Sequence, residues 1–102
     1  MNIIRILEQA GSFAEDKDVA ADLRQKILMP ALERGEDLQV DFEGVEGATQ
    51  SFIHAMISEI VRRMGGDILE RIEFRNCSAT VRSVIEIVAE YSQIDEGIAG
   101  QG

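Results

Sequence analysis

The chain of 102 residues is poor in the residues that most often carry chemistry: it has one cysteine, one histidine, one proline and no tryptophan. The lone Cys77 excludes a disulfide within the chain, which fits a reducing compartment. With His54 as the single histidine, a closed zinc site built only from cysteine and histidine is excluded too. We expect His54 to be a surface or boundary histidine and Cys77 to be a buried structural thiol, because neither is accompanied by a second ligand or base.

Positive charge and long apolar runs are also scarce. Nineteen acidic residues against ten basic ones give a formal charge of -9, and such a surface repels phosphate backbones, so we expect no nucleic-acid partner. Residues 1–14 lack the basic start and sustained apolar run of a signal peptide, and no stretch approaches the roughly 20 apolar residues that span a bilayer. The expected location is the cytoplasm, without membrane attachment. Aromatic residues are only 5% of the chain, so aliphatic side chains must fill the core.

Hydrophobic periodicity predicts three strands that alternate with three helices. The strands are expected at residues 2–7, 37–42 and 71–75, and the last two alternate apolar and polar side chains. Strands buried on both faces would read as continuous apolar runs, so this alternation indicates that the helices pack on one face only. The sequence therefore predicts an α/β fold: one small domain, residues 1–92, with a mainly parallel sheet in β-α-β-α-β-α order. A flexible C-terminal tail is expected at residues 93–102.

Several boundaries of these elements can be predicted from capping and breaking residues. Asp16 or Asp18 suits the start of the first helix, and Pro30 predicts a kink or an early end near Leu28. A loop is expected over residues 8–16, with a short extended piece around Phe13. Residues 52–64 carry the clearest amphipathic helix, with Ser58 on its polar side, and Ser78 is expected to cap the last helix.

The segment between the second strand and this amphipathic helix has the most informative pattern in the chain, DFEGVEGATQSF at residues 41–52. Asp41-Phe42-x-Gly44-Val45 ends the strand, and Ser51-Phe52 opens the helix. The segment resembles the STAS-like domain family of unknown function, DUF4325, which is related in fold to the STAS domains of bacterial anti-sigma factor antagonists. The resemblance extends over residues 19–92 and is strongest at 38–64.

The resemblance implies a site as well as a fold. In the antagonists a kinase that is also the anti-sigma factor phosphorylates a serine at this helix start, and the corresponding residue is Ser51. The flanking residues Thr49, Gln50 and Phe52 depart from the antagonist pattern, and Phe52 is expected to fill the core. A structural role for Ser51, capping or packing, stays open beside phosphorylation. The candidate partner-binding residues are Asp41, Glu43, Gly44, Glu46, Gly47, Thr49, Gln50 and Ser51, and for Asp41 a role in capping the turn is an equal alternative.

The resemblance and the missing catalytic groups together predict a function class. We expect a non-enzymatic, protein-binding regulatory module of partner-switching type, without catalytic residues, metal or cofactor. Its partner would be a GHKL-type kinase or an anti-sigma-like protein. The alternative is an accessory domain that senses a small ligand or nucleotide. A homodimer through the polar sheet face, an open strand edge or the last helix stays open.

Overall fold

Three parallel strands form the central sheet in the order β1-β3-β5. The computed structural model describes the backbone of residues 2–101 and the side chains of residues 2–92. Strands β1 (Asn2–Arg5) and β5 (Ile72–Arg75) lie on either side of β3 (Leu38–Asp41). Parallel neighbours must be joined by crossovers, and helices supply them here. The predicted α/β fold with a parallel sheet is therefore confirmed, although the first strand ends two residues earlier than expected.

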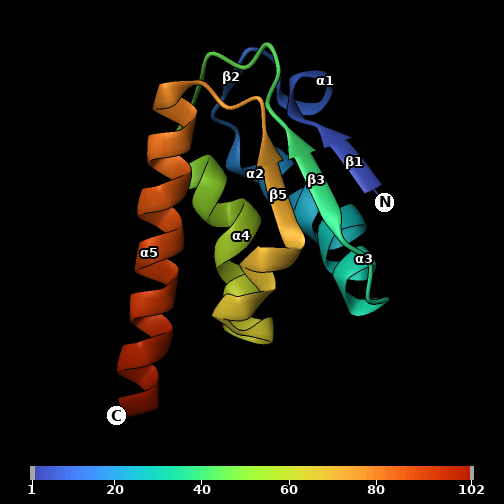
Figure 1. The fold of residues 1–102 in the computed structure, drawn as a ribbon. Helices are drawn as coiled ribbons and strands as arrows, with labels where there is room; N and C mark the ends of the chain where they lie inside the picture. The colour runs from blue at the N-terminus through green and yellow to red at the C-terminus, as the bar shows by residue number, and fades with distance from the viewer. Residues whose placement is uncertain (1, 102) are drawn as a thin grey trace.

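The two faces of this sheet differ in the way that the alternation predicted. Ile4, Leu38, Val40 and Ile72 lie on the inner face and are buried, and Phe74 beside them is half-buried. Within residues 2–101 no helix covers the outer face (Figure 1). The side chains on this face are mainly polar. In register across the strands these outer residues are Ile3, Gln39 and Glu73, and then Arg5, Asp41 and Arg75.

The inner face is covered by the main helices α2 (Lys17–Leu23), α4 (Gln50–Met64) and α5 (Ala79–Gln101). Figure 1 shows α2 and α4 behind the sheet and α5 running along α4. Asp16 begins α2, since its side chain accepts a hydrogen bond from the amide of Asp18 at 2.9 Å. Ser78 caps α5 as predicted, with its Oγ accepting from the amide of Val81 at 3.1 Å. None of the helices within residues 2–101 combines the length and hydropathy that a bilayer crossing demands.

The N-terminal region contains more regular structure than the sequence predicted. A short helix α1 (Ile6–Ala10) replaces the end of the expected strand and the start of the expected loop. Its first residue, Ile6, is fully buried and anchors the helix to the core. The helix ends at Gly11, whose φ of 83° favours glycine. The extended piece expected at Phe13 is present as β2 (Phe13–Ala14), which pairs in parallel with β4 (Gly47–Ala48).

Of the two alternatives predicted near Leu28, a kink or an early helix end, the early end is wrong, because the helix continues with an irregular turn there. A π-helical turn (Arg24–Leu28) follows α2 and leads directly into α3 (Met29–Glu33). Pro30 lies at the start of α3, where its missing amide costs least. The wider turn before Pro30 lets the chain continue as a helix and bury Leu28, Ala31 and Leu32.

Helix α4 is the centre of the core. Phe52, Met56 and Ile60 on this helix are completely buried, so the expected core role of Phe52 is confirmed. Ser58 was placed on the polar side and is also buried, because α4 is enclosed by α2 and α5 as well as by the sheet. Gly65, with φ 89°, ends α4, and a 3-10 helix (Gly66–Arg71) leads into β5. The flexible tail expected at residues 93–102 lies outside the residues whose side chains are described, and it stays a prediction.

Candidate functional site

The turn that follows β3 is shaped by Asp41. Its Oδ1 accepts hydrogen bonds from the amide of Glu43 at 2.9 Å and from Nδ2 of Asn76 at 3.0 Å. These two hydrogen bonds lower the pKa of the Asp41 carboxyl below its ordinary value, because they favour the charged form. The bond from Asn76 has the larger effect. Val45 closes the turn by donating its amide to the carbonyl of Phe42 at 2.9 Å. Asp41 therefore caps the turn, which was one of the two roles predicted for it.

The rest of the turn is fixed by its neighbours. Two of its amides donate hydrogen bonds to the segment around β2: Glu46 donates to the carbonyl of Ser12 at 2.7 Å, and Thr49 donates to the carbonyl of Ala14 at 2.9 Å. The Oγ of Ser78 donates to the carbonyl of Glu46 at 3.3 Å. A surface loop tied down at three points presents its side chains in a defined arrangement, as a recognition surface requires.

The predicted partner-binding residues divide into two groups. Five of them are exposed, and we call these five residues the turn surface: Glu43, Gly44, Glu46, Gln50 and Ser51. The other three serve the fold. Asp41 and Thr49 are half-buried, and their side-chain oxygens accept backbone hydrogen bonds. Gly47 is buried against the ring of Phe13, and a Cβ at position 47 would lie 2.9 Å from Cε2 of that ring.

Ser51 does not cap α4. The capping oxygen is Oγ1 of Thr49, which accepts from the amide of Phe52 at 3.1 Å. Ser51 is exposed in the first turn of α4, and within residues 2–92 its hydroxyl makes no hydrogen bond that meets ordinary geometry. The capping role considered for Ser51 is therefore wrong, because the chain provides a better-placed hydroxyl two residues earlier. The Ser51 hydroxyl is left available to solvent.

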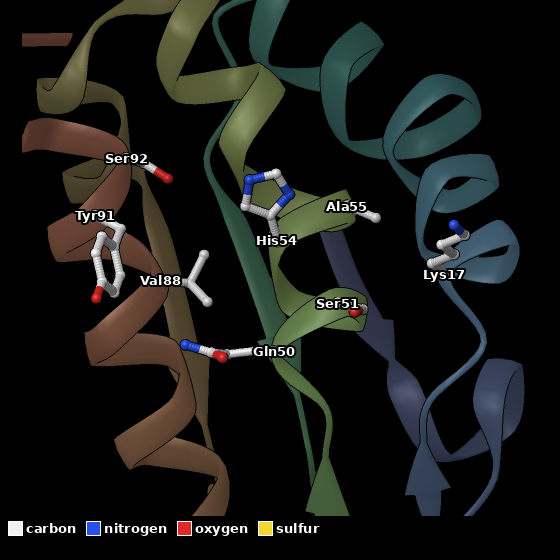
Figure 2. A pocket seen from close by; sticks show the side chains of 8 residues that line it. All are labelled: Lys17, Gln50, Ser51, His54, Ala55, Val88, Tyr91 and Ser92. Atoms are coloured by element: carbon white, nitrogen blue, oxygen red, sulfur yellow. The ribbon is translucent and has the colours of Figure 1, made fainter. Parts of the chain in front are cut away.

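A cleft opens beside Ser51, between the beginnings of α2 and α4 and the middle of α5. It has a volume of about 510 Å³. Figure 2 shows Gln50 directed toward α5, Ser51 on the side of α4 nearer α2, and His54 between the two neighbouring helices. The residues that line it are Lys17, Gln50, Ser51, His54, Ala55, Val88, Tyr91 and Ser92. Sequence reasoning missed Lys17 and Tyr91, since only the packing of three helices brings them to Ser51.

The other residues singled out from the sequence have modest roles. His54 is exposed, as expected, although it borders the cleft. Cys77 is half-buried and not fully buried as expected; its thiol lies 3.8 Å from the carbonyl oxygen of Arg75, and burial raises its pKa. Within the described part of the chain, no group of three or more His, Cys, Asp or Glu side chains is placed to hold a metal ion.

Comparison with known proteins gives one result for the family. Neither the curated proteins nor the solved structures contain a match to this chain. The family model described as "STAS-like domain of unknown function (DUF4325)" matches residues 19–82, well over half of the chain. The matched region runs from α2 into the first turn of α5 and includes the whole turn surface and Ser51. The chain therefore belongs to the DUF4325 family of STAS-like domains.

Proposed function

We propose that this chain is a cytoplasmic, non-enzymatic protein-binding module of partner-switching type, controlled by phosphorylation of Ser51. The observation that carries the proposal is the exposed hydroxyl of Ser51, which the fold does not use because Thr49 caps the helix. A serine that stabilises nothing can be modified without loss of the fold. Its position also corresponds to the phosphorylated serine of the anti-sigma factor antagonists that the sequence resembles.

The turn surface supports binding to another protein. Its side chains are exposed while its backbone is held by Ser12, Ala14 and Ser78, so a partner would meet a preformed shape. Glu43 and Glu46 make this surface acidic, and within residues 2–92 neither carboxylate forms an ion pair. A partner with basic side chains, such as a GHKL-type kinase or an anti-sigma-like protein with a basic docking face, would complement it.

Phosphorylation would change this surface at its edge. A phosphate on Ser51 adds nearly two negative charges next to Gln50 and within a turn of Thr49. The added charge and bulk would alter the affinity of a partner that covers the start of α4. The domain would then exist in two states with one fold and different surfaces, as partner switching requires.

The experiment begins with tagged wild-type chain, used to isolate binding proteins from cells of the source organism. Any kinase-like or regulatory protein found by mass spectrometry is then purified, and its affinity is measured by calorimetry for wild type, Ser51→Ala and Ser51→Asp. We expect Ser51→Ala to bind like wild type, and we expect the affinity of Ser51→Asp to differ from that of wild type by at least about tenfold, a change of about 1.4 kcal/mol. Incubation of the purified partner with ATP should phosphorylate wild type and leave Ser51→Ala unmodified.

Ser83→Asp is the matched control, because Ser83 is exposed on α5 and lies outside both the turn surface and the cleft. It should bind like wild type. The proposal fails if no regulatory or kinase-like protein is recovered at near-native concentration. It also fails if Ser51→Asp and Ser83→Asp bind the purified partner equally well.

The cleft beside Ser51 favours a second candidate function, the sensing of a small ligand or nucleotide. Its volume is in the range of ligand pockets, and it combines the apolar Val88 with the polar Lys17 and His54. A thermal-shift screen with nucleotides tests it, since a ligand at 100 times its Kd stabilises the folded state by about 2.7 kcal/mol. A reproducible rise in melting temperature that Tyr91→Ala abolishes would support sensing, and the absence of any rise at millimolar nucleotide would contradict it.

A further inference from the structure

Lys17 differs from the other cationic side chains of this acidic protein. Nine arginine and lysine side chains each form an ion pair or donate a hydrogen bond within the described residues: Arg5, Arg24, Lys26, Arg34, Arg62, Arg63, Arg71, Arg75 and Arg82. For Lys17 neither kind of contact is found in residues 2–92, although Asp16 and Asp18 are its neighbours in the chain. Asp16 is directed to the amide of Asp18 instead.

Lys17 lies at the cleft that Ser51 also lines. It is the first residue of α2, and α2 packs along α4, so Lys17 and Ser51 line the same cleft from two facing helices. Figure 2 shows Lys17 across the gap from Ser51, with His54 one turn further along α4. Lys17 and Ser51 thus line one cleft, and within residues 2–92 neither the ammonium group nor the hydroxyl is used by the fold.

We propose that Lys17 is the cis partner of phosphorylated Ser51: its ammonium group crosses the cleft and pairs with the phosphate. This inference rests on the proposed function, since it presupposes modification at Ser51. In that step the γ-phosphoryl group of a nucleoside triphosphate passes to Oγ of Ser51. The bond to the β-phosphate oxygen breaks, the nucleoside diphosphate leaves, and the hydroxyl proton goes to a base of the kinase.

The pair would link α2 to α4. Hydrogen bonds between an ammonium and a phosphate are charge-assisted and stronger than neutral ones, and Lys17 can form one without giving up an existing partner. The other ionisable side chains that line the cleft are His54 on α4 and Tyr91 on α5. The carboxylates of Asp16 and Asp18 do not line it, but they flank Lys17 in the chain. The carboxylates oppose the phosphate, which leaves Lys17 as the permanent cation that can hold it.

The test uses the full chain with phosphoserine incorporated at position 51 during synthesis, so no kinase is needed. The pH titration of its phosphorus NMR signal gives the second pKa of the phosphate, which is about 6 for a free phosphoserine. All samples carry His54→Gln, which removes the imidazole from the cleft. We expect this pKa to lie about half a unit or more below that of Lys17→Gln, because a nearby cation favours the dianion. Lys17→Arg should keep the lowered value.

Lys26→Gln is the matched control, because it removes the same charge from the same helical segment while Lys26 pairs with Asp22 at 3.0 Å and does not line the cleft. It should leave the phosphate pKa unchanged. Equal pKa values in the parent and in Lys17→Gln would overturn the inference, as would an equal shift in Lys26→Gln. Neither result depends on a binding partner, so this inference and the partner-switching proposal fail through separate measurements.

Discussion

The hydroxyl groups of Ser58 on α4 and Ser92 on α5 lie 2.9 Å apart and are hydrogen-bonded to each other. Both side chains are buried, with exposed fractions of 7% and 8%. They form a buried polar contact between the two helices. A buried hydroxyl without a partner costs more than the hydrogen bond itself contributes, so each serine depends on the other.

The stability losses on replacing the two serines should therefore not add. We expect Ser58→Ala and Ser92→Ala each to lower the free energy of unfolding by about 1–2 kcal/mol, because each leaves one hydroxyl unpaired. The double variant should lose clearly less than the two single losses added together. Urea unfolding measures all three, and Ser83→Ala on the exposed side of α5 should stay within about 0.5 kcal/mol of wild type. Simple additivity would show that the two hydroxyls do not interact in solution.

The two hydroxyls at the start of α4 should contribute unequally to stability. Thr49→Ala removes the cap that accepts from the amide of Phe52 and should cost about 1 kcal/mol. Ser51→Ala removes an exposed hydroxyl and should cost less than about 0.5 kcal/mol. Thermal unfolding of the two variants, with Thr49→Ser as a cap-preserving control, checks both. A larger loss for Ser51→Ala than for Thr49→Ala would contradict the assignment of the cap.

Gly44 should resist substitution for two reasons. Its φ is 83°, and a Cβ there would lie 2.7 Å from Cδ2 of Leu7. Gly35 has a φ of 85° with nothing within 4 Å of a Cβ, so Gly35→Ala isolates the conformational cost of about 1–2 kcal/mol. We expect Gly44→Ala to cost more than this control. The excess should disappear when Leu7→Ala is added, and an excess that persists would mean that the contact with Leu7 is not its cause.

The Asp41 carboxyl should titrate below the ordinary aspartate value of about 3.9, because Asn76 and the amide of Glu43 favour its charged form. A lowered pKa in the folded state means that Asp41 stabilises the fold above the unfolded pKa. This contribution is lost as the pH falls through the folded pKa. NMR titration of the carboxyl should show a higher pKa in Asn76→Gly, which removes the donor and tolerates the φ of 56° at that position. An unchanged pKa would assign the shift to the turn amide alone.

Much of this fold could be predicted because its signals are local. The alternation of Leu38 and Val40 located β3 and its buried face, and the aliphatic stripe from Phe52 to Met64 located α4. Gly35 and Gly65 follow helices and have the positive φ that glycine favours at such ends. In each case a single physical rule acts within a few residues, and no competing interaction overrides it.

The errors arose where tertiary packing decides the outcome. Ser58 appeared polar-facing because nothing local shows that α5 covers that side of α4. Pro30 normally ends a helix, but here a π-helical turn precedes it and the chain continues. At the candidate site, Ser51 was recognised from the motif, whereas Lys17 could not be, because no pattern in the chain relates two residues 34 positions apart on different helices.

The strand order has a consequence for how this chain folds. Asn2 pairs with Leu38, and Leu38 pairs with Ile72, so neighbouring strands of the central sheet are separated by at least 34 residues of sequence. Each pairing must close a long loop before it gains any contact, and loop closure of this kind slows folding relative to helix formation. Helices such as α4 can form within microseconds, while the sheet waits for three distant segments to meet. The rate-limiting event in folding should therefore be the arrival of β1 and β5 on either side of β3.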